Sequence, residues 1–365
     1  MQLLELRVSQ YRNFTKQEIQ FSPGVNLLVG GNGQGKTNLL EAVYFLGYGK
    51  SFRTAIPREC IQHGQRECLI GGTIGEGELL RELHVAVSFL EKKLFISGKA
   101  ASLDEFAGNL HVLAFTNEHL TIVRGGPKER RAFLDRAMIT LYPGHLRRLA
   151  NFGRAVKQRN RMLSAARAGG KAVNSRLLDS WDETLIREGS RIAWNRNRYV
   201  DELKKELPAG IFGSEEIKIQ YLSSVPGLNE ELTAIADKYR ERLLQARSID
   251  EKSGSTSVGP HRDDLKLFMN GKNLADYGSA GQQRSCLLSL FFAQMEIHRK
   301  YHGFYPVFLV DDAEAELDEK RLRTFLDYLS ERTQTFLTTA KESFLPPIAG
   351  KTSRFLIQTG TIIPS

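Results

Sequence analysis

A glycine-rich loop near the start of the chain limits the possible folds more than any other segment does. Its residues fit the pattern G-x-x-x-x-G-K-[ST]: Gly30, Gly31, Asn32, Gly33, Gln34, Gly35, Lys36 and Thr37. An apolar run over 25–29 precedes the loop, and a run of helical character over 38–43 follows it. Loop amides and a helix N-terminus together bind phosphate. The strand–loop–helix order therefore predicts a nucleotide-binding α/β domain.

Four side chains have predicted roles toward ATP and Mg²⁺. The Lys36 ammonium is expected to reach the β- and γ-phosphates, and the Thr37 hydroxyl to ligate Mg²⁺. A second apolar run, 308–310, ends in Asp311 and Asp312. Asp311 is well placed to hold Mg²⁺ through water, and Asp312 to orient or deprotonate the attacking water. Without the phosphate loop, this pair would be interpreted as a helix cap or a solvated turn.

A second anion site is predicted ahead of a later helix. The segment 279–284 has the sequence Ser-Ala-Gly-Gln-Gln-Arg, and an apolar helix is expected over 285–295. A hydroxyl, a glycine N–H and a helix N-terminus favour an anion, although an N-capping serine in a tight turn is the simpler alternative. The segment resembles the signature of ABC-type ATPase heads, which implies that Ser279, Gly281 and Gln282 contact the γ-phosphate bound to a second copy. Glu316 and Asp318 then resemble the D-loop of that class.

The positive charge of the chain is concentrated in its middle. The 365 residues include 51 Lys+Arg and 42 Asp+Glu, which gives a formal net charge of +9. Between Arg124 and Lys205 there are 20 basic and 8 acidic residues, a balance of +12, so the rest of the chain is slightly acidic. The span from Arg136 to Leu178 contains ten basic residues and no acidic one. Nucleic acid is a candidate partner for such a segment.

The basic segment has a helical pattern. Apolar residues recur on one face from Leu149 to Leu163, while Arg147, Arg154 and Arg161 step by seven on another face. Gly169-Gly170 interrupts the pattern; a second helix is expected to extend to Leu203 and a third over 228–244. Two interpretations remain open, an ordinary solvated face and a surface that contacts phosphates. For the second, the candidate DNA contacts are Arg147, Arg148, Arg154, Lys157 and Arg161.

Runs of strand character flank this helical segment on both sides. They cover residues 3–8, 25–29, 94–96, 265–269, 307–310, 335–338 and 355–358. An α/β domain interrupted by a helical insertion fits this order. We expect residues 1–120 and 251–365 to form one discontinuous ATPase head, and residues 121–250 to form a basic helical lobe.

Motifs along nearly the whole chain resemble the RecF family of SMC-like ABC-type ATPases. They are Tyr11-Arg12-Asn13-Phe14, Gly49-Lys50-Ser51-Phe52-Arg53, the segments 125–135 and 256–265, and Asp311-Asp312 followed by Glu316-Leu317-Asp318. The resemblance implies an ABC-type ATPase head with a mixed sheet and an inserted, mainly helical second lobe. Arg12 and Asn13 are implied to contact the nucleotide, with a structural turn as the open alternative.

The same resemblance implies a function in recombinational repair and replication. It implies an ATP-dependent homodimer on DNA at single-stranded gaps and duplex junctions, which helps RecO and RecR to load RecA. Slow, DNA-stimulated ATP hydrolysis would be the switch. Two departures qualify this: Glu314 stands where the family often has a small residue, and no magnesium-sensing glutamine occurs near Thr116, where Asn117 or Glu118 is a possible substitute.

Other classes of protein fit the sequence less well. No export signal and no long uncharged apolar run occur, so we expect a cytoplasmic, nucleoid-associated protein without a membrane partner. Cys60, Cys68 and Cys286 are expected to be buried or idle thiols. No ligand cluster suggests a metal other than Mg²⁺. The alternatives are a transporter ATPase subunit, disfavoured by the helical insertion, and a structural SMC-like clamp with vestigial hydrolysis.

Overall fold

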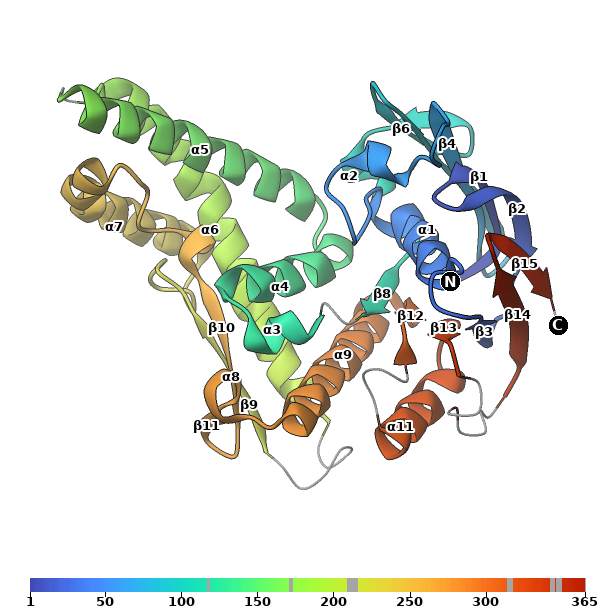
Figure 1. Ribbon diagram of the computed structural model, residues 1–365. Helices are drawn as coiled ribbons and strands as arrows, with labels where there is room; N and C mark the ends of the chain where they lie inside the picture. The colour runs from blue at the N-terminus through green and yellow to red at the C-terminus, as the bar shows by residue number, and fades with distance from the viewer. Residues whose placement is uncertain are drawn as a thin grey trace. The chain divides into compact units, whose positions relative to one another are not determined.

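The chain divides into two compact units (Figure 1). A computed structural model describes residues 1–116, 119–170, 173–208, 216–313, 318–341, 345 and 350–364. Unit 1 comprises Met1–Leu120, Pro208–Ser214 and Arg284–Ser365, and unit 2 comprises Thr121–Leu207 and Glu215–Gln283. Within the described residues, no helix combines the length and the apolar character that crossing a membrane requires.

A six-stranded, mostly parallel sheet forms one half of unit 1. Its order is β15-β14-β3-β13-β12-β8, and only β15 runs antiparallel to its neighbour. Strands β3, β12 and β13 are buried at every position, as is usual for parallel strands covered on both faces. β12 is wholly apolar and β3 is apolar except for Asn26, whereas β13 combines Phe336 and Leu337 with three buried threonines. The strands are β3 (Val25–Val29), β8 (Val112–Phe115), β12 (Val307–Val310), β13 (Thr335–Thr339), β14 (Thr352–Gln358) and β15 (Thr361–Pro364).

An antiparallel sheet in the order β2-β1-β4-β5-β6-β7 completes the strands of unit 1. Helix α1 contacts strands of both sheets, so it is buried along almost its whole length. The strands are β1 (Gln2–Tyr11), β2 (Phe14–Gln20), β4 (Glu67–Glu76), β5 (Leu79–Ser88), β6 (Lys92–Ile96) and β7 (Lys99–Ala101). The helices are α1 (Lys36–Tyr48), η1 (Pro57–Cys60), α2 (Leu103–Phe106), α9 (Ala280–His302), which begins in unit 2, and α11 (Glu319–Ser330).

Unit 2 combines long helices with a three-stranded sheet, β11-β10-β9. The predicted break at Gly169-Gly170 is confirmed, because Gly170 closes a helix with a φ of 57°. The helices are α3 (Leu120–Arg124), α4 (Pro127–Leu141), α5 (His145–Gly169), α6 (Ser175–Glu206), α7 (Leu232–Ser253), η3 (Pro260–Arg262) and α8 (Leu274–Tyr277). The strands are β9 (Ile217–Leu222), β10 (Asp264–Met269) and β11 (Lys272–Asn273).

The structure places residues 251–283 differently from our expectation, which had assigned them to the ATPase head. They belong to unit 2. The reason is that β10 pairs antiparallel with β9 along its whole length, from Asp264 opposite Leu222 to Met269 opposite Ile217. This pairing joins segments far apart in the chain, and periodicity alone does not reveal it.

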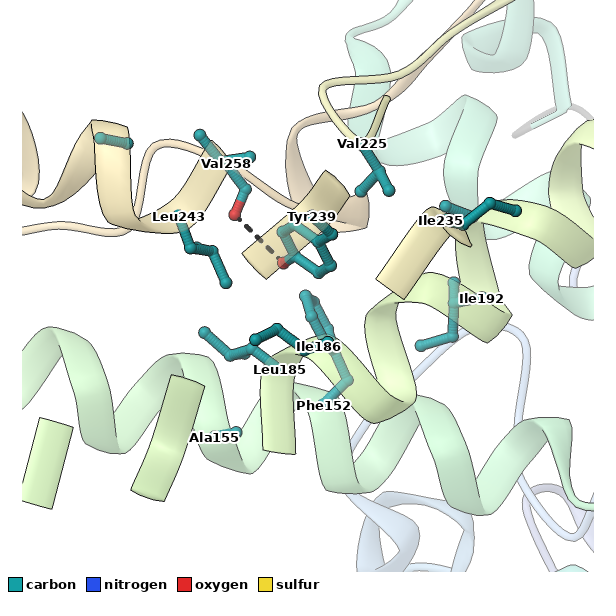
Figure 2. Packing of buried hydrophobic residues seen from close by; sticks show 12 residues of the cluster. Phe152, Ala155, Leu185, Ile186, Ile192, Val225, Ile235, Tyr239, Leu243 and Val258 are labelled. Carbon is teal, nitrogen blue, oxygen red and sulfur yellow. Dashed lines mark hydrogen bonds between the residues drawn. The ribbon is translucent and has the colours of Figure 1, made fainter. Parts of the chain in front are cut away.

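The apolar faces of α5, α6 and α7 form the core of unit 2 (Figure 2). Phe152 comes from α5, Ile186 from α6 and Tyr239 from α7, and all three are buried. The Tyr239 hydroxyl donates a hydrogen bond of 3.3 Å to the Val258 carbonyl oxygen. Gly189 lies in the middle of α6, where an added Cβ would lie within 3.0 Å of the rings of both Phe152 and Tyr239. A glycine is therefore required for this close packing.

A buried arginine ties the same three helices together electrostatically. Arg159 of α5 donates to Asp182 of α6 and to Asp250 of α7, with both nitrogen–oxygen distances 2.6 Å. The Arg159 side chain is fully buried, so its charge requires these partners. One of the ten basic residues in the acid-free span is thus part of the core and not of a binding surface.

Candidate nucleotide site and basic helical surface

The phosphate loop joins β3 to α1 in a backbone shape that depends on its glycines. Gly35 is the N-cap of α1 with a φ of 116°, and a Cβ there would lie 2.6 Å from the Asn13 side chain. A Cβ on Gly30 would lie 2.4 Å from the Ile357 carbonyl oxygen of β14. Both positions therefore exclude a side chain. The strand, loop and helix expected from the sequence are confirmed.

The functional side chains of the loop face its backbone and the end of β12. The Lys36 ammonium donates to the carbonyl oxygens of Gly30 at 2.7 Å and Gly31 at 3.0 Å, and only 4% of the residue is exposed. The Thr37 hydroxyl donates to both carboxylate oxygens of Asp311, at 2.9 and 3.0 Å. Two segments 274 residues apart thus meet at the carboxyl edge of a parallel sheet, where α/β proteins bind ligands.

Asp311 and Asp312 are held in place by the neighbouring strand β13. The Thr338 hydroxyl donates to Asp311 Oδ1 at 2.9 Å and accepts from the Asp312 amide at 2.8 Å. Burial raises the pKa of Asp311 above its ordinary value; the hydrogen bonds from Thr338 and Thr37 oppose this rise, and the charge of Asp312 adds to it. Asp312 has a φ of 47°, a strained backbone for a non-glycine residue.

The donor set of this site suits Mg²⁺. A hydroxyl oxygen and a carboxylate already lie in contact at Thr37 and Asp311, beside a phosphate loop. Mg²⁺ is a hard cation that takes oxygen ligands from one or two carboxylates and from substrate phosphates. The residues present therefore fit the ion that the loop motif implies.

Arg12 and Asn13 support the start of α1. The Arg12 guanidinium makes two hydrogen bonds to the buried Glu41 carboxylate of α1, at 2.8 and 2.6 Å. The Asn13 amide donates to the Gln34 carbonyl oxygen at 2.8 Å, and its oxygen accepts from Asn38 at 2.8 Å. These contacts position the phosphate loop and α1. A direct contact of either residue with nucleotide stays a prediction.

The predicted signature residues lie at the first turn of α9. The Ser279 hydroxyl accepts a hydrogen bond from the Gln282 amide at 3.2 Å, and the Ser279 amide donates to the Gln282 side chain at 3.0 Å. This reciprocal pair is a capping box, so Ser279 caps the helix. Ser279 is exposed and Gly281 half-buried. A trans contact to phosphate stays a prediction that is compatible with this exposure.

Only one of the two D-loop residues can be placed. Asp318 is the N-cap of α11: it accepts from the Arg321 amide at 2.9 Å and forms an ion pair with the Arg321 guanidinium. Glu316 and Glu314 lie outside the described residues, as do Asn117 and Glu118, the suggested substitutes for a magnesium-sensing glutamine.

Most of the predicted DNA contacts are exposed on α5. Arg147, Arg154, Lys157 and Arg161 are all exposed, and among the described residues no carboxylate oxygen lies within 4.0 Å of their charged nitrogens. Arg148 differs, because it is half-buried and lies 3.5 Å from the Glu188 carboxylate. The seven-residue spacing of three arginines on a continuous helix gives one positively charged stripe.

Known proteins are similar to this chain over nearly its whole length. Residues 2–359 match the family described as RecF/RecN/SMC N terminal domain. A protein of Halothermothrix orenii named DNA replication and repair protein RecF is 36% identical over 348 residues, covering 93% of this chain and 92% of that protein. A Streptococcus thermophilus protein of the same name is 34% identical over 368 residues, covering 99% and 98%.

The chain belongs to the RecF family. Its fold is likewise similar to a solved structure of the recombination mediator protein RecF with ATPrS, with a TM-score of 0.91, 31% identity and coverage of 100% of this chain and 98% of that one. A RecF–ATP structure gives a TM-score of 0.88 at 30% identity, covering 100% and 99%. A head domain of an Smc protein, with a TM-score of 0.57 and 14% identity, shares the fold. The expected α/β ATPase-head fold is confirmed.

Two of the RecF-type motifs, residues 125–135 (the first motif) and 256–265 (the second motif), lie in unit 2 and form ion pairs there. Arg130 of the first motif makes hydrogen bonds of 2.6 and 3.1 Å to Asp264 of the second, and both are buried. Asp135 of the first motif makes two hydrogen bonds of 2.8 Å to Arg196 of α6. Arg196 also donates to the Pro260 carbonyl oxygen at 2.6 Å. We had not expected these pairs, since the sequence gives only the motifs and not their partners.

His261 of the second motif packs against neighbouring residues of unit 2. Its Nε2 lies 3.1 Å from the Thr256 carbonyl oxygen, and its ring lies 5.7 Å from that of Phe152. Burial lowers its pKa to about 4. The described contacts of His261 are therefore those of a packed side chain.

The Asp135–Arg196 pair leads to a testable dependence of stability on pH. Burial opposes ionisation, but the charge of Arg196, with hydrogen bonds from His145 and Arg196, lowers the Asp135 pKa from 3.8 to about 2. Ionised Asp135 therefore stabilises the fold at every pH above its pKa in the unfolded chain, by about 2 kcal/mol at neutral pH. This stabilisation is lost as the pH falls through the pKa of Asp135 in the folded chain. We expect the stability gap between the native chain and Asp135→Asn to shrink by roughly 1 kcal/mol from pH 7 to pH 3. Urea unfolding checks this, and a constant gap would contradict it.

Proposed function

We propose that this chain is an ATP-dependent DNA-binding protein of recombinational repair and replication, with weak DNA-stimulated ATPase activity. It closes as a homodimer on DNA at single-stranded gaps and duplex junctions, where it helps RecO and RecR to load RecA. The observation that carries the proposal is the contact of Thr37 with Asp311 beside the phosphate loop. The relatives named DNA replication and repair protein RecF, and the solved RecF–ATP structure described as part of the RecFOR pathway, support it.

The residues of the site divide the chemistry among them. The loop amides and Lys36 bind the phosphates of ATP, and Thr37 and Asp311 would hold Mg²⁺. When bound, Mg²⁺ neutralises the charge that develops on the phosphate oxygens. Asp312 accepts the proton of the attacking water, and its backbone is fixed for this role by Thr338.

ATP joins two chains because the phosphate loop of one chain lacks the γ-phosphate contacts that the other chain supplies. Ser279 and Gly281, exposed and half-buried at the first turn of α9, contribute a hydroxyl and an amide to the γ-phosphate held by the partner. The exposed arginines of α5 then contact DNA phosphates, a form of binding that does not select sequence.

Sedimentation velocity tests the proposal as a whole. We expect a monomer without nucleotide, a dimer with ATP and Mg²⁺, and a further shift on gapped DNA that exceeds the shift on plain duplex or single strands. A chain that stays monomeric with ATP, or that binds DNA equally with and without nucleotide, would contradict the proposed switch. Because the readout is mass and shape, slow hydrolysis does not interfere.

Ser279→Arg tests the signature separately from nucleotide binding. The larger side chain is expected to block ATP-dependent dimerisation, while ATP binding at the phosphate loop remains as in the native chain. Loss of the α9 cap is expected to lower the free energy of unfolding by about 1 kcal/mol. The control variant must therefore lose a helix cap as well. Ser102→Arg is the control, because Ser102 forms a capping box with Glu105 at α2. If the Ser279 variant still dimerises with ATP, the signature assignment fails.

A further inference from the structure

Three histidines from two distant segments meet in unit 1. His111 lies immediately before β8, and His298 and His302 lie four residues apart on α9, hence on one face of that helix. One ring nitrogen from each lies within 4.8 Å of the other two. His111 and His298 are buried, and His302 is half-buried. The cluster was not identified from the sequence, because His111 lies 187 residues away from His298.

The contacts of His298 fix which of its nitrogens can act as a ligand. Its Nδ1 lies 2.9 Å from the Phe304 carbonyl oxygen, which can only accept, so Nδ1 carries the proton. In a neutral imidazole the lone pair is then on Nε2, which accepts a hydrogen bond of 2.5 Å from Nδ1 of His111. A metal ion bound by both nitrogens would replace the proton between them, and His111 would carry its proton on Nε2 instead. Histidines that bind metals usually donate their other ring N–H to such a carbonyl. His298 thus has the orientation of a metal ligand.

Burial acts in the same direction on two of the three imidazoles. Burial lowers the pKa of His111 to about 4, and the charge of His302 lowers it further. Burial likewise lowers the pKa of His298 to about 3, together with the charge of His111.

We propose that His111, His298 and His302 bind one Zn²⁺ ion, with water in the fourth position. Three imidazoles suit zinc, whereas Mg²⁺ and Ca²⁺ take oxygen ligands. Tetrahedral zinc at its usual bond length places two ligand nitrogens about 3.3 Å apart. The His111–His298 distance of 2.5 Å would open slightly and the wider separations would close.

The site has a structural consequence for unit 1. It joins the last turn of α9 to the start of β8, which is the edge strand of the parallel sheet. The ion would thus fix the end of the helix whose first turn carries the predicted signature. This role does not depend on ATP or DNA, so it can be tested without them.

The experiment uses the full chain, purified without a polyhistidine tag and stripped of metal with a chelator. Isothermal titration with ZnCl₂, in the absence of ATP and Mg²⁺, is expected to give one ion per chain and a rise in the melting temperature. Co²⁺ in its place is expected to give the intense visible absorption of a tetrahedral ion. The absence of stoichiometric Zn²⁺ binding would overturn the proposal.

His302→Gln removes a half-buried ligand and is expected to weaken Zn²⁺ binding more than about 100-fold and to abolish the Co²⁺ spectrum. His298→Gln is the second variant. His63→Gln, at an exposed histidine, is the matched control and should bind as the native chain does. Unchanged Zn²⁺ affinity in both cluster variants would place the ion elsewhere and overturn the assignment. If either variant fails to fold, the Co²⁺ spectrum of the native chain still decides between tetrahedral and surface binding.

Discussion

Replacing Arg147, Arg154 and Arg161 together by alanine is expected to lower DNA affinity about 10²–10³-fold at roughly 0.1 M salt. These side chains are exposed on α5, and no carboxylate among the described residues pairs with them. Each phosphate that they neutralise releases counterions, so their loss also flattens the salt dependence, with a log–log slope shallower by about three. If about 6–10 phosphates are contacted in all, the native chain loses roughly 10³–10⁵ in affinity between 50 and 200 mM salt.

Fluorescence anisotropy of labelled duplex DNA, measured over this salt range with ATP present, checks both numbers. A control of equal charge is available in unit 2, where Lys204, Lys205 and Lys238 are exposed but form ion pairs with Asp or Glu side chains. Alanine at these three positions changes the net charge equally and should leave the slope near the native value. Equal slopes in the two triple variants would remove α5 from the DNA interface.

The sequence was sufficient for the parts of the fold that local patterns determine. The strands β3 and β12 are mainly apolar runs, and the glycine pattern of the phosphate loop specifies the turn between β3 and α1. The end of β12 at Val310 could be predicted because the paired carboxylates Asp311 and Asp312 follow an apolar run. Thr37 and Asp311 then meet because parallel strands share one carboxyl edge.

Contacts between residues far apart in the sequence could not be predicted from local patterns. Arg159 belongs to the acid-free span, yet it is buried because Asp182 and Asp250 come from two other helices. A signal for this existed: Arg159 lies seven residues after Phe152 and therefore on the apolar face of α5. For the histidine cluster, the sequence shows only the four-residue spacing of His298 and His302. It does not reveal that His111, 187 residues away from His298, lies beside them.

Asp312→Asn is expected to reduce ATP turnover about 10²–10⁴-fold, the usual contribution of a general base. Asparagine has nearly the same size, and the amide of residue 312 would still donate to Thr338, so the backbone at this position should be preserved. ATP binding and ATP-dependent dimerisation are expected to persist, because Lys36, Thr37 and Asp311 are unchanged. The variant should accumulate as a closed dimer on DNA, measured by phosphate release together with sedimentation.

Lys36→Ala is the comparison that gives this result its meaning. The Lys36 ammonium lies against the carbonyl oxygens of the loop that we propose to bind the ATP phosphates, so its removal should abolish ATP binding and dimerisation together. The two variants thus separate a loss of chemistry from a loss of binding. Normal turnover by Asp312→Asn would refute the base role. If the variant instead behaved as Lys36→Ala does, Asp312 would belong to the binding pocket, and the strained backbone at this residue would serve nucleotide affinity rather than hydrolysis.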